Sequence, residues 1–228
     1  KDAFKTIKKA GLAGLMGGFV MSFSFIAFVF AMMNTSVANV VFIISTQTMF
    51  LAIFGYFYLR EKISIIGLLS IMLAMMGISV MIGDSISGGT LFGNLVALTI
   101  PVSFSILVMI IRKNANLDLV PAIWYASISS TLISFLMTND LSFTNNDILM
   151  GFLLGVPQLT FGFVCITIGS RTTKSVTIGL LMLTETIFAP LWVWLFLNEI
   201  PPISVFIGGF VIILALILKS FDKKIIKV

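Results

Sequence analysis

The sequence predicts an all-α integral membrane protein with eight membrane-spanning helices. Three observations carry this prediction. Of the 228 residues 59% are hydrophobic and 10% are charged, the mean hydropathy is +1.15, and the apolar residues collect in runs of about twenty. In an average soluble domain about a quarter of the residues are charged. The composition therefore excludes a soluble enzyme and a nucleic-acid-binding module.

The apolar runs define the spans in chain order. Each run is long enough to cross about 30 Å of hydrocarbon as a helix, and none alternates as the strands of a membrane barrel do. The first three spans are Gly11 to Met33, Val37 to Leu59 and Ile63 to Ile82, and the next five are Phe92 to Ile111, Leu119 to Met137, Ile148 to Ile168, Val176 to Leu197 and Ile203 to Phe221. The joints between them are short and turn-like, and none has room for a soluble domain.

The positions of the positive charges predict the orientation. Lys and Arg near span ends accumulate on the cytoplasmic side of a membrane. With the amino terminus inside and eight crossings, all 14 Lys and Arg residues fall on one side. The opposite joints carry only Asp84, Asp140, Asp147 and Glu199. This pattern favours eight spans with both chain ends in the cytoplasm.

The chain contains a hidden repeat. A shift of 138 positions aligns residues 35–65 with residues 173–203 without a gap. The matching residues of the first copy are Thr35, Thr46, Thr48, Phe50, Leu59, Glu61 and Ile65. The two copies cross the membrane in opposite directions, as in the inverted repeats of secondary transporters, whose substrate site lies between the copies. The alternative is that two unrelated membrane helices share these residues by composition.

The repeat predicts two domains: residues 1–88 as a partial first repeat of three helices, and residues 89–228 as a second repeat of five. The first copy is then two helices shorter than the second. A complete first copy would begin about fifty residues before Lys1. We therefore expect the chain to be an amino-terminally incomplete version of a ten-helix protein.

Three segments resemble a known family. LTETIFAPLWVWLFLNE from Leu183 to Glu199 is similar to the ninth helix of EamA-type members of the drug/metabolite transporter superfamily. GVPQLTFGF, from Gly155 to Phe163, resembles the eighth helix, and the segment from Asn34 to Ser64 resembles the fourth helix with its flanking joints. The resemblance covers nearly the whole chain, as family helices three to ten. It departs from the family at Ala52, where a proline is common, and at Asn198, where relatives usually have glycine.

The resemblance implies an inverted-repeat carrier in the plasma (inner) membrane. Such carriers move small metabolites, amino acids or drugs by alternating access, often outward, so we expect this chain to be an exporter or permease. Its partners are then the lipid bilayer and a small-molecule substrate. Nucleic acid is not an expected partner, and the sequence leaves the oligomeric state and the substrate open.

Glu185 is the only charged residue deep inside a span. A carboxylate at the bilayer centre is unfavourable by several kcal/mol, so it should face the bundle interior or water. We predict that Glu185 couples protons or binds substrate; the alternative is a neutral acid that hydrogen-bonds a neighbouring helix. Gln47 occupies the equivalent place in the first copy, so the pair predicts an asymmetric site at mid-depth.

Further polar and aromatic residues extend the candidate site. Trp192 shares the helix face of Glu185 at helical spacing and either flanks a ligand or belongs to an interfacial aromatic belt. Gln158, Asn39 and the run from Ser127 to Thr131 either line a wet cavity or bond across helices. Glu61, between Arg60 and Lys62, is interpreted as a solvated helix end, with an inward gate as the alternative.

Three prolines and two glycine pairs bear on helix geometry. Pro101, Pro157 and Pro190 lie within spans and each removes a backbone hydrogen bond, so they are candidate hinges or static kinks. The pairs Gly14 with Gly18 and Gly151 with Gly155 have the spacing of close helix packing, and we predict that role for both.

Other functions fit the sequence less well. It has no histidine and one cysteine, Cys165, so we expect no metal, no cofactor and no intramolecular disulfide. An intramembrane enzyme would need paired acids, a nucleophile with its base, or metal ligands at depth, so we expect no enzyme activity. A channel-like bundle and a non-transporting membrane adaptor remain the alternatives to a transporter.

Overall fold

The computed structural model describes residues 3–82, 90–138, 142–197 and 202–222, and every regular element in these ranges is a helix. The sequence joints with Asp84, Asp140 and Glu199 lie outside the described residues. In chain order the elements are α1 (Ala3–Asn34), α2 (Val37–Ser45), α3 (Gln47–Leu59), α4 (Ile65–Ile82), α5 (Leu91–Lys113), α6 (Pro121–Met137), α7 (Asn145–Leu153), the π-helical η2 (Leu154–Thr160), α8 (Phe161–Gly169), α9 (Ser175–Leu197) and α10 (Ile203–Ser220).

These elements confirm the all-α membrane fold predicted from the sequence. Within the described ranges six helical stretches are long and apolar enough to cross a membrane, and two shorter apolar helices, Ile65–Met81 and Pro121–Met137, complete the set. Each of them coincides with one predicted span to within a few residues. In lipid a run of about twenty apolar residues satisfies its backbone hydrogen bonds by forming a helix.

By its contacts the chain forms two compact units. Unit 1 comprises residues 1–26 and 106–172, and unit 2 comprises residues 27–105 and 173–228. The division into repeats 1–88 and 89–228 stays a prediction, since compact units describe packing and not the relatedness of sequences.

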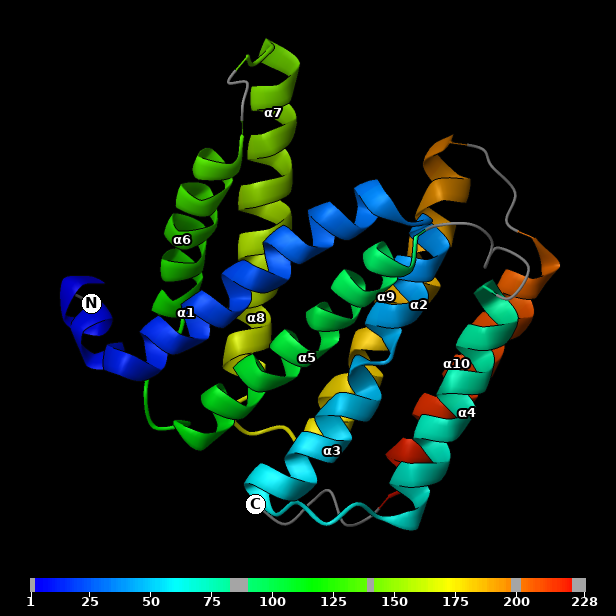
Figure 1. Cartoon of the computed structure of the whole chain (residues 1–228). Helices are drawn as coiled ribbons and strands as arrows, with labels where there is room; N and C mark the ends of the chain where they lie inside the picture. Colours follow the sequence, from blue (N-terminus) through cyan, green and yellow to red (C-terminus); the bar gives the residue numbers. More distant parts are fainter. Residues whose placement is uncertain (1–2, 83–89, 139–141, 198–201, 223–228) are drawn as a thin grey trace. The chain divides into compact units, whose positions relative to one another are not determined.

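In unit 2, α4 and α10 lie side by side (Figure 1). Their backbones come close at Gly77 and Gly208, where a Cβ atom built on Gly208 would lie 2.4 Å from the Gly77 carbonyl oxygen. Small residues permit such backbone contact between membrane helices. Around this contact Ala74, Ile78 and Ile212 are fully buried, so the glycines let the two helices form a continuous apolar core.

Also in unit 2, α3 packs against α9. The Thr48 hydroxyl donates a hydrogen bond of 3.1 Å to the Gly179 carbonyl, and a Cβ on Gly55 would lie 2.9 Å from the Ser175 side chain. Later residues of α3 therefore meet earlier residues of α9, which means that the two helices run antiparallel. The two helices lie in the segments that the sequence repeat aligned, and the relatedness of these segments stays a prediction.

In unit 1, α1 packs on α6. A Cβ on Gly18 would lie 2.5 Å from the Tyr125 Cβ and 2.7 Å from the Ala122 carbonyl oxygen, which confirms the predicted packing role of the first glycine pair. The prediction was wrong for Gly151 and Gly155, since no described atom lies within 4 Å of a Cβ built on either. The spacing of small residues does not by itself say which face of a helix meets a neighbour.

Two predicted spans are interrupted. The span from Val37 divides at Thr46, whose hydroxyl donates a 2.6 Å bond to the Ile43 carbonyl and so competes with the helical backbone. The span over residues 145–169 divides at η2, which contains Pro157. A third irregularity is Gly11, whose positive φ of 51° interrupts α1.

Candidate functional site

A cavity of about 190 Å³ with hydroxyl-bearing and apolar lining residues lies within unit 1. It is bounded by α1, α6, η2 and α8, near the middle of their spans. Its lining residues are Phe25, Ile123, Ser127, Ser130, Thr131, Gly155, Leu159, Thr160 and Phe163. We call it the hydroxyl cavity, because four of these described lining residues carry hydroxyl groups and none carries a charge.

Pro157 shapes one wall of the hydroxyl cavity. Its ring clashes with the carbonyl four residues earlier in a regular α-helix, and it supplies no N–H to bond that carbonyl. A π-helical turn pairs groups five residues apart and is wider, which relieves the clash, and such turns are frequent at functional sites. Within η2 the Thr160 hydroxyl donates a 2.8 Å bond to the Gly155 carbonyl, five residues earlier in the same segment.

Three of the four hydroxyl groups of the lining donate their proton to a backbone carbonyl. Ser127 donates its proton to the Ile123 carbonyl at 3.0 Å, and Ser130 donates to the Ser127 carbonyl at 3.1 Å. A hydroxyl has one proton but two lone pairs, so an oxygen whose proton is engaged can still accept a hydrogen bond. The Phe25 and Phe163 rings meet edge to face with centroids 5.3 Å apart and form the apolar part of the lining.

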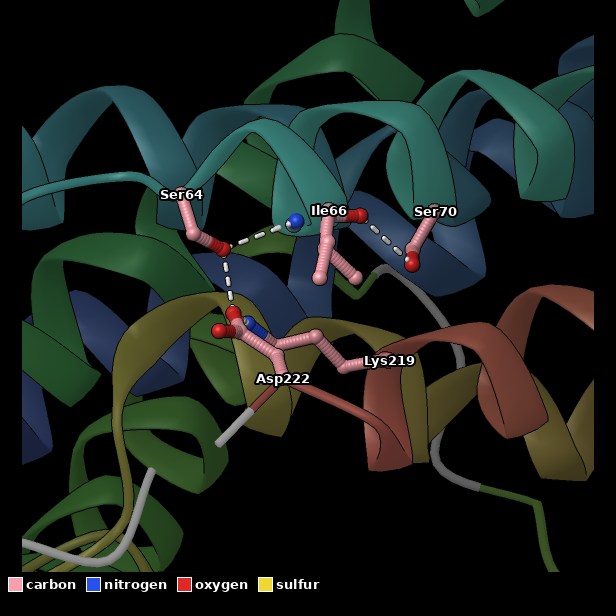
Figure 2. A network of polar contacts seen from close by, with 6 residues as sticks. Ser64, Ile66, Ser70, Lys219 and Asp222 are labelled. Atoms are coloured by element: carbon pink, nitrogen blue, oxygen red, sulfur yellow. Dashed lines mark hydrogen bonds and ion pairs between the residues drawn. The ribbon is translucent and has the colours of Figure 1, made fainter. Parts of the chain in front are cut away.

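At the helix ends of unit 2 lies a buried charged network (Figure 2). The Lys219 ammonium donates to the Asp222 carboxylate at 2.8 Å, and the Ser64 hydroxyl donates to the same carboxylate. The Ser64 oxygen also accepts the Gly67 backbone N–H at 2.9 Å, at the start of α4. Because Lys219 and Asp222 are only 7% and 5% exposed, each needs the other to compensate its lost hydration.

Nearby in unit 2, Glu61 caps α9. Its carboxylate accepts the Ser175 backbone N–H at 3.0 Å. A carboxylate at a helix amino terminus satisfies an orphan donor and opposes the positive end of the helix dipole. Glu61 is half-buried, so it is more than the solvated helix end that the sequence suggested.

Glu185 and Gln47, equivalent by the sequence repeat, have different environments. Gln47 is 6% exposed at the beginning of α3, directly after the break at Thr46. Glu185 is exposed on α9, along a stripe whose other members Leu181, Phe188 and Trp192 are 51–55% exposed. The Trp192 and Phe196 rings stack with their centroids 5.8 Å apart.

The other predicted polar residues lie in separate places. Asn39 is buried near the start of α2, where its amide donates to Thr35 at 3.2 Å and to Asn94 of α5 at 3.4 Å. This is the cross-helix bonding that the sequence left as the alternative. Gln158 is exposed within η2, beside Pro157.

The three prolines differ in their local structure. Pro101 is fully buried in α5, where the Ser105 hydroxyl donates to its carbonyl at 2.7 Å. Both α5 and α9, the latter with Pro190, continue as α-helices through their prolines. Only at Pro157 does the described helix change type.

The sequence did not single out Ser64, Lys219 or Asp222. One signal was available: Asp222 directly follows the last apolar run and stands three residues after Lys219, the spacing of a helical ion pair. No pattern indicated that Ser64, 158 positions earlier, would meet it.

These features define a class, namely a multi-pass helical membrane protein with a hydroxyl-lined cavity near the middle of its spans. The model of the EamA-like transporter family matches residues 1–83 and 91–221, and the chain belongs to this family. It is therefore a membrane transporter, acting in a lipid bilayer on a small-molecule substrate. This confirms the resemblance found in the three sequence segments.

Two further similarities agree with the assignment. The chain is 27% identical over 230 residues to an uncharacterized transporter of Clostridium kluyveri, and the match covers 94% of this chain and 73% of that protein. A solved structure, described only as the crystal structure of a protein, matches with a TM-score of 0.75 at 15% identity, over 99% of this chain and 91% of the other. The second similarity concerns the fold alone.

Proposed function

We propose that this protein is a secondary-type exporter that moves a small metabolite, amino acid or drug by alternating access, and that it is not an enzyme. The observation that carries the proposal is the hydroxyl cavity, a space near mid-span where four hydroxyl-bearing residues gather among apolar helices. Polar groups inside membrane helices are costly and mark substrate pathways.

The lining favours a substrate that donates hydrogen bonds. Ser127, Ser130 and Thr160 use their protons on backbone carbonyls, so their oxygens are left to accept. The Phe25 and Phe163 rings suit an apolar group or, through their faces, a cation. A small molecule with an amino group and an apolar part meets both requirements.

The residues predicted from the sequence have assigned parts in this proposal. Glu185 stays a candidate for proton coupling or substrate anchoring, Gln47 and Gln158 stay candidates for polar contacts, and Trp192 stays a candidate for flanking the ligand. Asn39 has no such part, because its amide bonds Thr35 and Asn94. Pro101, Pro157 and Pro190 act as hinges while the two halves rock around the site. The change of helix type at Pro157 is the feature that best supports a hinge.

The proposed location is the plasma (inner) membrane with both chain ends in the cytoplasm. The support is the distribution of the 14 Lys and Arg residues, which an eight-span chain collects on one side.

Transport in proteoliposomes tests the proposal. We expect saturable uptake with counterflow for at least one amine in a panel of amino acids, amines and cationic drugs. Replacing both Ser127 and Ser130 by alanine should raise the half-saturating concentration about three- to tenfold for each hydroxyl that contacts the substrate. Ser129→Ala, on the same helix but outside the cavity lining, is the matched control.

Several outcomes would contradict the proposal. Ohmic current in place of saturable flux would indicate a channel, and no flux of any panel member would favour an adaptor. An equal effect of Ser129→Ala would remove the hydroxyl cavity from the substrate pathway. For Glu185→Gln we expect a lost pH dependence of transport, and an unchanged rate, affinity and pH profile would exclude its coupling role.

A further inference from the structure

A second cavity, of about 290 Å³, lies at the helix ends of unit 2. Its lining residues are Ala52, Glu61, Lys62, Ile63, Ser64, Lys174, Val176, Lys219 and Asp222. We call it the lysine cavity, because three separate segments each contribute a lysine. These segments are the α3–α4 joint, the residues before α9 and the last turn of α10. Helix ends are where a membrane protein meets water and lipid headgroups.

The two carboxylates of the lining are already engaged. Glu61 accepts the Ser175 backbone N–H. Asp222 accepts from Ser64 and Lys219 (Figure 2). The lining thus contains three lysines and two carboxylates, a net charge of +1, and Lys219 is paired with Asp222.

Two helix amino termini lie beside the lining, since α4 begins at Ile65 and α9 begins at Ser175. Each already has an acceptor within the protein: Glu61 accepts the Ser175 N–H, and Ser64 accepts the Gly67 N–H. The proposed site therefore depends on the lysines and not on the helix ends.

We propose that the lysine cavity binds a phosphate-bearing anion, either the headgroup of an anionic lipid or free inorganic phosphate. Basic pockets between membrane helices bind anionic headgroups, since lysines near the surface attract them. A volume of 290 Å³ lies near the lower end of ordinary small-molecule sites, which span about 300–1,000 Å³. The site is separate from the hydroxyl cavity in its residues and does not depend on which substrate is transported.

The binding experiment uses the full chain in a neutral detergent. Short-chain phosphatidylglycerol, short-chain phosphatidylcholine and inorganic phosphate are each titrated, with binding followed by calorimetry. We expect phosphatidylglycerol to bind more tightly than phosphatidylcholine if the headgroup is the ligand, and inorganic phosphate to bind if the site takes the free anion. Either result supports the proposal and identifies the source.

Lysine variants test whether the anion binds in the lysine cavity. Lys62 is exposed and Lys174 half-buried, so replacing them by glutamine should leave the fold intact, which thermal unfolding checks. Each replacement should weaken binding about fivefold, and arginine at both positions should restore it. Lys113→Gln, an exposed lysine at the end of α5, is the matched control and should have no effect.

The proposal is overturned if neither phosphatidylglycerol nor phosphate binds in preference to phosphatidylcholine. It is also overturned if the double variant with Lys62→Gln and Lys174→Gln binds the anion as tightly as the unmodified protein does. The same holds if Lys113→Gln weakens binding equally. Because binding is measured without flux, each of these results leaves the transport proposal untouched.

Discussion

In unit 2, α4 and α10 touch backbone to backbone at Gly77 and Gly208, whereas in unit 1 the stretch from α7 to α8 buries Thr167 alone among its described residues. The two cavities also differ in the polar side chains that line them. Five charged side chains line the lysine cavity at helix ends, and neutral hydroxyls line the hydroxyl cavity near mid-span. The position along a span thus decides which polar side chains can line a cavity, because burying a charge far from water costs much more free energy than burying a hydroxyl.

Breaking the buried ion pair of unit 2 should have the largest effect. Asp222→Asn leaves the Lys219 ammonium buried without its counter-charge and should lower the free energy of unfolding by about 3–5 kcal/mol. Thermal unfolding in detergent measures the loss. The exposed neighbour Ser220, changed to alanine, is the control.

Replacing both members of the pair by apolar residues sharpens this test. Lys219→Met with Asp222→Leu should recover most of the lost stability, since no uncompensated charge remains. A double variant as unstable as Asp222→Asn would mean that the network with Ser64, and not charge compensation, stabilises this end of the unit.

Removing the helix interruption at η2 in unit 1 should raise the stability of the protein and not lower it. Pro157→Ala restores a backbone donor and removes the ring clash, so η2 should become α-helical with a gain of up to about 3 kcal/mol in stability. Transport should fall, because the residues before and after η2 would rotate about the helix axis relative to each other. Val156→Ala, exposed in the same segment, should change neither property. Unaltered stability and flux in Pro157→Ala would show that the proline does not maintain the break.

Glycine substitutions compare the packing of the two units directly. Gly208→Ala places a Cβ atom 2.4 Å from the Gly77 carbonyl oxygen and should cost about 1–3 kcal/mol. Gly151→Ala meets no described atom within 4 Å and should be neutral or stabilise by up to about 1 kcal/mol. Equal losses at both positions, seen in thermal unfolding, would contradict the difference in packing between the units.

Much of the fold was predictable from the sequence. The run from Phe92 to Ile111 became α5, and the run from Ile203 became α10, because continuous apolar sequence in a bilayer must form helix. The break at Thr46 was not predicted. A threonine within an apolar run is compatible with an unbroken helix, and only the backbone geometry shows its hydroxyl on the Ile43 carbonyl.

The candidate site was predictable only in part. The serine run of α6 was proposed to line a cavity, and Ser127, Ser130 and Thr131 do so. Asn39 was a candidate for the same role, but it bonds Thr35 and Asn94 instead. Residue type shows that a polar group needs a partner, and the partner is chosen by which helix lies opposite.

The sequence by itself determined the class, because hydropathy summed over twenty residues outweighs every local preference, and it also determined the family through its motif segments. The tertiary structure alone decided that Gln47 is buried while its counterpart Glu185 is exposed, and that Ser64, Lys219 and Asp222 meet. These facts depend on contacts between residues far apart in the chain, and a hydropathy pattern contains no information on which helix faces adjoin.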